Sequence, residues 1–147
     1  MRHVMNPEIK QKWITALRSG DYKQGKYRLK QEANGETCHC CLGVLAEMVR
    51  DDEGYGISNR IILISQMPNR RMCEAAGFEG DVVNFAVPLW LVLKHAPNGM
   101  VMNEIDQDKI DIIDGLECVM ISTLNDNLGF TFTEMANLLE ELEGFAN

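Results

Sequence analysis

The sequence predicts an α+β fold: a helix-rich single domain over residues 1–147 with a small antiparallel β-hairpin or sheet. Segments near both ends of the chain carry apolar residues at helical spacing. Between two short segments lies the pair Asn34-Gly35, a strong hairpin signal because both residues tolerate positive φ. The length of 147 residues is close to the commonest size of one domain.

The first predicted element is a helix over residues 6–20. Asn6 suits the N-cap, Pro7 suits the first helical position, and Gly20 suits the position just after the helix. Its apolar face consists of Ile9, Trp13, Ala16 and Leu17.

Two strands are expected next, on either side of the Asn34-Gly35 turn. Tyr27 and Leu29 alternate with two basic residues, which is the period of a half-buried strand. The returning strand is short and ends near Cys40, and the segment 41–51 then has the apolar spacing of a second helix. The cysteines of this region therefore lie where a strand passes into a helix.

The middle of the chain gives weaker signals. We expect, in order, a loop over 51–60, a strand over 60–67, a short helix closed by Gly77, a strand or turn before a helix from Pro88 to His95, a poor helix over 100–115 and a helix over 116–126.

The last helix, over residues 131–143, is the clearest. Thr131 and Glu134 have the spacing of a capping box, in which each side chain binds a free amide of the first turn. We expect this helix and the helix over 6–20 both to pack on the helix that follows Cys41, because each has one apolar stripe to cover.

The formal net charge of -8 argues against nucleic acid as a general partner, because phosphate binding draws on clustered basic residues. The charge is unevenly distributed, however. Residues 8–30 contain seven basic side chains and only two acidic ones. This basic segment on an acidic protein predicts local binding of a small anion.

We expect no signal peptide, because residues 1–20 contain no apolar run with a cleavage site. No apolar run is long enough to span a membrane, so we expect no membrane partner. Its five cysteines form an odd, clustered set, which is typical of reduced thiols in a cytoplasm.

The sequence Cys38-His39-Cys40-Cys41 raises three possibilities: a metal site, a reactive thiol, or packing of small residues at a tight corner. Neighbouring residues of a strand point to opposite faces, and structural zinc prefers paired ligands from separate segments. We therefore expect no metal and no cofactor.

A reactive thiol is the sharper alternative. At the start of a helix, Cys41, or next Cys40, would lie near free amides and the positive end of the helix dipole, which favour thiolate. Packing is nevertheless favoured, because free cysteine is among the most buried residue types.

Two polar segments could contribute to an anion site. The segment 18–26 contains Arg18, Ser19, Gln24 and Lys26 beside two glycines. Asn125 and Asp126 lie between two predicted helices. Either segment could equally be a solvated turn stabilised by side-chain to backbone bonds.

These segments also carry a resemblance. The stretches "KWITALRSGDYKQGKYRLKQ", "CCLGVLAEM" and "STLNDNLGFTFTEMANLLEE" closely resemble an uncharacterised family of small proteins encoded by bacteriophages and prophages, with a Leu-Arg-Ser-Gly-x-Tyr-x-Gln-Gly … Cys-Cys-Leu-Gly-Val-Leu … Leu-Asn-Asp pattern. The matching positions are Trp13, Leu17, Arg18, Ser19, Gly20, Tyr22, Gln24, Gly25, Leu29, Cys40 to Leu45, Leu124 to Asp126, Phe132 and Ala136. The resemblance implies a phage protein that acts in the cytoplasm of a host bacterial cell.

The resulting functional hypothesis is a phage accessory protein that binds a partner without turnover. It would sequester a small anionic host metabolite or nucleotide signal, or block a host defence protein. The alternatives are a thiol-dependent enzyme that uses Cys41 and a structural or oligomerising module, for which a homo-oligomer is expected. The expected ligand-binding residues, beside the Cys40–Cys41 corner, are Arg18, Ser19, Gln24, Lys26, Asn125 and Asp126.

Overall fold

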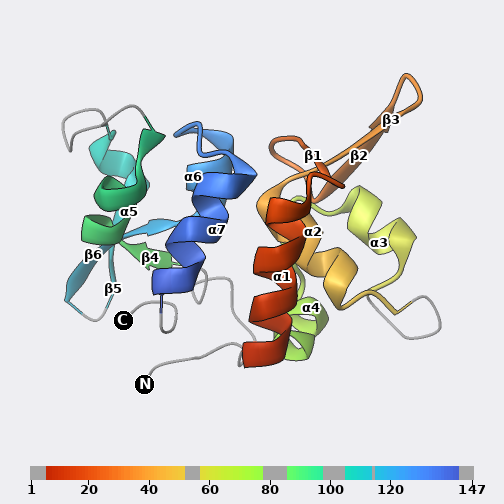
Figure 1. Cartoon of the computed structure of the whole chain (residues 1–147), viewed down its shortest axis with the longest axis horizontal. Helices are drawn as coiled ribbons and strands as arrows, with labels where there is room; N and C mark the ends of the chain where they lie inside the picture. The colour runs from red at the N-terminus through yellow and green to blue at the C-terminus, as the bar shows by residue number, and fades with distance from the viewer. Residues whose placement is uncertain (1–5, 52–56, 78–85, 98–104, 114, 143–147) are drawn as a thin grey trace.

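A computed structural model describes residues 6–51, 57–77, 86–97, 105–113 and 115–142 (Figure 1). In these ranges the chain forms one α+β domain with seven α-helices and two three-stranded sheets, which confirms the predicted fold class. None of the helices in the described ranges has the length and apolar character needed to cross a lipid bilayer.

Helix α1 (Pro7–Ser19) begins and ends as predicted. The Asn6 side chain accepts hydrogen bonds from the amides of Glu8 and Ile9, and Gly20 ends the helix in the left-handed conformation with φ 79°. The cap satisfies amides that have no partner inside the helix.

The first sheet has the strand order β1-β3-β2. It contains β1 (Lys23–Gln24), β2 (Lys30–Ala33) and β3 (Glu36–His39); β3 runs parallel to β1 and antiparallel to β2. Asn34 (φ 53°) and Gly35 (φ 79°) form the predicted two-residue turn, because a tight hairpin turn requires positive φ. The β2–β3 hairpin projects beyond the helices (Figure 1).

Three helices follow the first sheet: α2 (Cys41–Met48), α3 (Asn59–Ile64) and α4 (Arg70–Ala75). Helices α2 and α4 confirm predictions, but the expected strand over 60–67 is wrong. The Ser58 side chain caps α3 by accepting from the Ile61 amide at 3.4 Å. A run of β-branched residues favours a strand, and this cap with burial of Ile62 on one side overrides that preference.

The second sheet has the order β4-β6-β5, with both pairs antiparallel. It contains β4 (Ala86–Pro88), β5 (Ile110–Ile113) and β6 (Leu116–Met120), and it carries α5 (Leu89–His95), a 3₁₀ turn (Gln107–Lys109) and α6 (Ile121–Asp126).

Strand β4 followed by α5 confirms the expected strand and helix. Two other expectations for this region are wrong. Of the poor helix expected over 100–115, residues 100–104 and 114 lie outside the described residues, and the rest contains a 3₁₀ turn (Gln107–Lys109) followed by strand β5. The helix expected over 116–126 is a strand for its first five residues. The apolar run around Val119 fits both periods, and pairing with two neighbouring strands decides in favour of β6.

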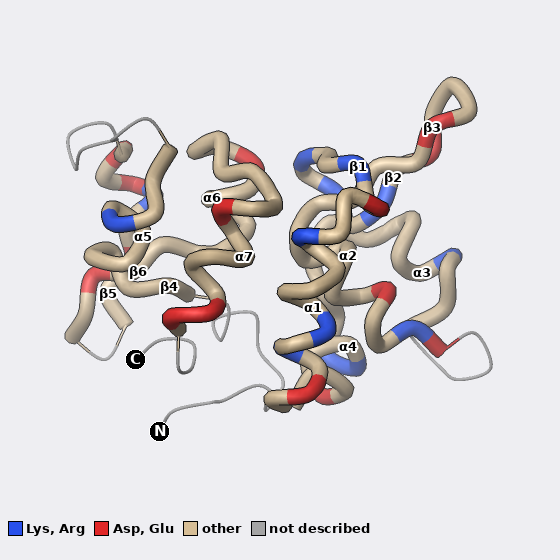
Figure 2. The backbone as a smooth tube through the Cα atoms, viewed as in Figure 1, with Lys and Arg blue, Asp and Glu red and all other residues tan. Residues whose placement is uncertain are grey.

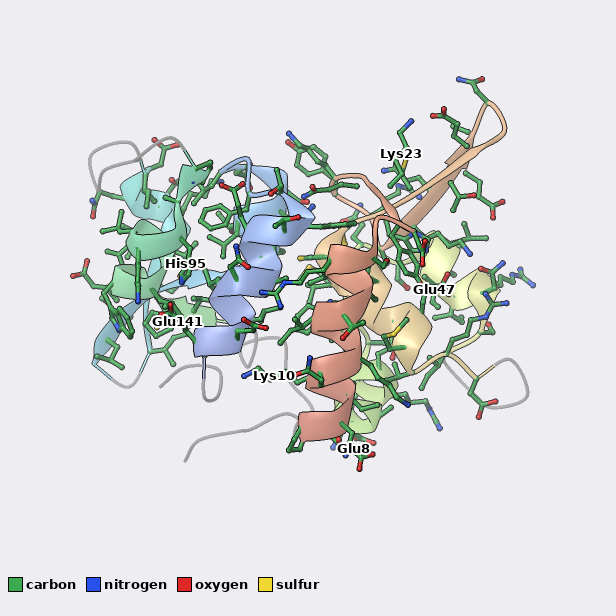
Figure 3. The ribbon with its side chains drawn as sticks, viewed as in Figure 1. Glu8, Lys10, Lys23, Glu47, His95 and Glu141 are labelled. Carbon is green, nitrogen blue, oxygen red and sulfur yellow. The ribbon has the colours of Figure 1, made fainter. Side chains whose placement is uncertain are left out.

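Helix α7 (Phe132–Glu141) has the predicted capping box between Thr131 and Glu134. Helix α1 packs on α2 as expected, whereas α7 packs mainly on α1 and α5, which corrects the expected packing on α2. Lys10 of α1 extends across to the end of α7, where its Nζ donates to the carbonyl of Leu142 (Figure 3). Helix α2 is already enclosed by α1, the first sheet, α3 and α6.

One hydrophobic core includes side chains from α1 and α2 as well as from α5, β6 and α7. Trp13 is fully buried, and its Nε1 donates to the carbonyl of Cys41 at 2.8 Å. Helix α2 approaches the chain before β2 so closely that a Cβ at Gly43 would lie 1.7 Å from the Leu29 carbonyl oxygen. Glycine is therefore required at position 43 for this packing.

A buried ionic cluster joins the first sheet to α2 and α3. Glu47 Oε2 lies 3.0 Å from His39 Nε2 and 3.4 Å from Lys30 Nζ, and Lys30 Nζ also donates to Asn59 Oδ1 at 2.6 Å. The hydrogen bond with His39 and the charge of Lys30 outweigh burial and lower the pKa of Glu47 to about 2. The cluster holds the base of the hairpin against α2 and α3. Its central residue, Glu47, is labelled in Figure 3.

We predict that Glu47 makes the fold acid-sensitive. Its folded pKa of about 2 lies below the usual value, so its stabilisation is present at neutral pH. That stabilisation is lost as the pH falls from about 5 towards 2. Urea denaturation across this range should show a free energy of unfolding that falls less steeply in Glu47→Gln than in the native chain, with the variant less stable at pH 7.

The exposed Glu36 provides the matched control, because it pairs with Lys23 at the surface. Glu36→Gln should leave the stability at pH 7 within about 0.5 kcal/mol of the native value. Equal pH slopes for the native chain and Glu47→Gln would contradict the assignment.

Candidate functional site

The Cys40–Cys41 corner is buried, as predicted. Cys40 is the N-cap of α2, and its Sγ accepts from the Gly43 amide at 3.4 Å. Cys41 is fully buried, with its Sγ 3.9 Å from the carbonyl oxygen of Ile121. The two thiols fill the junction where β3 passes into α2.

Burial opposes thiolate formation at both cysteines. It raises the pKa of Cys40 to about 11 and the pKa of Cys41 well above its usual value. The amides at the start of α2 act in the opposite direction, and desolvation outweighs them. Both side chains are therefore neutral thiols that pack the corner at neutral pH.

Asn125 is the polar centre of the region. It is 1% exposed, and its Oδ1 accepts from Gln24 Nε2 at 2.9 Å and from the Cys41 amide at 3.1 Å. Its Nδ2 donates to the carbonyl of Gly25 at 2.9 Å and to Asp126 Oδ1 at 2.8 Å. An asparagine amide has two acceptor positions and two donor hydrogens, so its hydrogen-bonding capacity is filled.

These bonds hold the loop that joins β1 to β2. Gln24 Nε2 donates to the Phe130 carbonyl at 2.7 Å as well as to Asn125. Asp126 Oδ1 accepts from the Tyr27 amide at 3.0 Å. Tyr27 has φ 70°, a left-handed conformation that is uncommon for a residue with a side chain. The loop conformation is thus fixed from α6, about a hundred residues further along the chain.

The sequence prediction placed Tyr27 in a half-buried strand, and this is wrong. Strand β2 begins only at Lys30, and the side chain of Tyr27 is 61% exposed. Leu29 is buried as expected, but Lys30 is buried too because Glu47 and Asn59 receive its ammonium group. Asp126 lies too far along the chain for local periodicity to reveal its bond to the loop.

Only some of the predicted site residues come together. Gln24, Asn125, Asp126 and the backbone of Cys41 form one connected network, and Lys26 lies in the loop that this network holds.

Arg18 and Ser19 have other contacts. Arg18 Nη1 pairs with Glu140, and Nη2 donates to Asn137 Oδ1 at 2.7 Å, so Arg18 joins α1 to α7. Ser19 Oγ donates to the Ala16 carbonyl at 2.6 Å and accepts from the Asp21 amide, as a local turn at the helix end.

Lys26 and Arg28 flank Tyr27 and are both exposed. Neither side chain forms an ion pair with another described residue. Figure 2 shows Lys and Arg positions gathered where the chain passes from β1 to β2. We call residues Lys26, Tyr27 and Arg28 the 26–28 loop; sequence reasoning named Lys26 for the site but missed the other two.

Among the surface hollows near these elements, one at the hairpin tip is lined by residues 32–37, including Glu32 and Glu36, and two others bear on the site. One, of about 580 Å³, lies against β2 and α3 and is lined by Arg28, Lys30, Gln31, Glu32, Ala33 and Leu63. The other, of about 600 Å³, follows α1 and has Glu8 and Asp21 against Lys12, so its rim is not basic. The hollow against β2 and α3 is the less acidic of these two, because Arg28 stands against Glu32 there while Lys30 is paired with Glu47, and this favours it over the hollow along α1 for an anion.

In the described part of the chain, no group of three or more His, Cys, Asp or Glu side chains is arranged to hold a metal ion. A family profile described as a domain of unknown function, DUF8296, matches residues 5–143. No curated protein and no solved structure matches the chain. The chemistry of the site must therefore be inferred from its own residues.

We predict that Asn125→Asp destabilises the protein although it hardly changes the side-chain shape. The variant keeps the acceptor oxygens but loses both donated bonds, and it places a second carboxyl group beside Asp126 in a buried position. The expected cost is about 2–5 kcal/mol, because buried partners lose their bonds and a buried charge is opposed. Chemical denaturation followed by Trp fluorescence measures it.

The exposed Asn127→Asp is the matched control and should change stability by less than about 0.5 kcal/mol. If Asn125→Asp costs no more than this control, the network around Asn125 does not hold the site.

Proposed function

The chain belongs to the DUF8296 family, and from this premise we propose that it is a binding protein without catalytic turnover. Its partner is anionic and is held at the 26–28 loop. A single observation carries the proposal: a left-handed, exposed tyrosine is fixed between two cations that have no ion pair in the described part of the chain.

The backbone of the loop supports this proposal. A left-handed residue other than glycine costs on the order of 1–3 kcal/mol, and such strain persists only where the surroundings enforce it. Here Asp126 binds the Tyr27 amide, and the buried Asn125 binds both the Gly25 carbonyl and Asp126, so two neighbouring side chains of α6 support one exposed loop. A loop that is held in a strained form is pre-organised for contact, which lowers the entropic cost of binding.

The charge distribution supports an anionic partner. The protein has a formal net charge of -8, and many of its cations are neutralised by neighbours, as in the pairs Arg18–Glu140, Lys23–Glu36 and Lys94–Glu141. Lys26 and Arg28 keep their charge available at the surface. Exposed cations of this kind attract anions and form charge-assisted bonds with phosphate or carboxylate.

The cysteines support binding rather than thiol chemistry. A nucleophilic cysteine needs thiolate character and access, and both Cys40 and Cys41 are buried with raised pKa values. Their packing holds the start of α2, to which Asn125 is bonded.

The resemblance described above supports a more specific proposal. We propose a phage accessory protein in the cytoplasm of a host bacterium, where it sequesters a small anionic metabolite or blocks a host defence protein. Both roles use the same loop, because each needs fixed positive charge at the surface of an otherwise acidic protein.

The prediction is that Lys26→Ala/Arg28→Ala abolishes partner retention and leaves the fold intact. Native mass spectrometry of protein purified at low salt from bacterial lysate should show an added mass on the native chain that is lost in the double variant. Retention should weaken as salt rises, because screening weakens the contacts of exposed charges.

Lys12→Ala/Arg60→Ala is the matched control, since both side chains are exposed cations elsewhere on the surface. It should retain the added mass. The proposal fails if the loop variant retains the partner as well as the control, or if the native chain retains none.

A further inference from the structure

The ring of Tyr27 is unusual for an exposed residue. It is 61% exposed and makes no ring contact with another described residue. In a regular strand, Tyr27 would point away from the face that carries Lys26 and Arg28. The left-handed backbone at Tyr27 breaks this alternation, and the aromatic ring and both cations of the loop are exposed.

Different anions would use these three side chains differently. A bare phosphate or a carboxylate needs only the cations. A nucleotide also needs the ring, because every base has a flat π-face that stacks on an aromatic side chain. Lysine and arginine then bind its phosphate oxygens, arginine with two parallel bonds.

A hollow adjoins the loop at Arg28; Tyr27 and Lys26 are not among its lining residues, so it takes only the part of a ligand that extends past Arg28. Its volume of about 580 Å³ lies within the usual range of about 300–1,000 Å³ for small-molecule sites. Arg28 is the lining residue whose cation has no ion pair with a described residue, because the Lys30 ammonium is bound to Glu47 and Asn59 and the Gln31 amide donates to the Lys26 carbonyl. Leu63 gives the hollow an apolar part. Glu32 also lines the hollow and opposes a phosphate close to it, which favours the side of Arg28 for the phosphate.

We propose that the occupant of the 26–28 loop is a nucleoside phosphate, with its base against Tyr27 and its phosphate at Lys26 and Arg28. This inference rests on the proposed binding function and names the ligand class for the same site. The site is small and local, so it takes a nucleotide of one or two units rather than a long strand, in keeping with the net charge of -8.

Isothermal titration at low salt with defined probes tests the proposal. The probes are adenosine and guanosine mono- and triphosphates, inorganic triphosphate, a poly-glutamate peptide and a single-stranded oligonucleotide. The nucleoside triphosphates should bind at least about tenfold more tightly than inorganic triphosphate, since only they stack on the ring.

Ring variants separate stacking from charge. Tyr27→Phe keeps the aromatic face and should bind nucleotides nearly as the native chain does. Tyr27→Leu should raise the Kd for nucleotides about 5- to 150-fold and leave the Kd for inorganic triphosphate nearly unchanged. A Tyr27→His variant, which keeps a flat ring, should lie closer to Tyr27→Phe than to Tyr27→Leu.

Several outcomes overturn the nucleotide inference and leave the proposed function intact. The first is equal affinity for nucleotides and inorganic triphosphate, with no effect of Tyr27→Leu. The second is tighter binding of poly-glutamate than of any nucleotide. The third is an oligonucleotide that binds at least about 100-fold more tightly than its monomers. If no probe binds, but the native chain still retains from lysate an added mass that the loop variant loses, the nucleotide inference fails and the proposed binding function stands. If Lys26→Ala/Arg28→Ala binds every probe as the native chain does, both proposals fail.

Discussion

The buried amide of Asn125 is the interaction on which the arrangement of this protein depends. The first amides of a helix have no partner within it, and Asn125 supplies one for Cys41 at the start of α2. The same amide binds Gln24 and Gly25 beside β1. A single side chain of α6 therefore sets the relative positions of α2, the first sheet and the loop that leaves it.

The remaining features of the site follow from this constraint. With α6 fixed against the start of α2, Asp126 is in place to bind the Tyr27 amide and to hold it in the left-handed form. Gly43 lets α2 lie against the Leu29 carbonyl, and the cluster around Glu47 holds the hairpin from the opposite end of α2. The small, neutral thiols of Cys40 and Cys41 fit the corner that these contacts leave. The loop is thus positioned by hydrogen bonds and close packing. Its two cations, Lys26 and Arg28, form no ion pair with another described residue.

Local signals in the sequence predicted the elements with defined ends. Asn6, Gly20 and the pair Thr131 and Glu134 mark helix ends through bonds made within a few residues, so α1 and α7 were predictable. The β6–α6 boundary was missed because one apolar run fits both a strand and a helix, and only the partners β4 and β5 decide between them. Membership of Asn125 and Gln24 in the site could be inferred, but their mutual bond could not.

Tyr27 shows why the remainder lay beyond sequence reasoning. Its backbone conformation depends on the hydrogen bond that its amide donates to Asp126, and the burial of Lys30 depends on Glu47 and Asn59. These partners are distant in the sequence, so no local pattern indicates them. The most direct test is amide hydrogen exchange, read for Tyr27 and Cys41 by NMR. If Asn125 and Asp126 hold the loop, the Tyr27 amide exchanges slowly despite its exposed side chain, with protection close to that of Cys41, and Asp126→Ala removes the protection at Tyr27 alone. A Tyr27 amide that exchanges at the rate of an unfolded chain in the native protein would contradict the account.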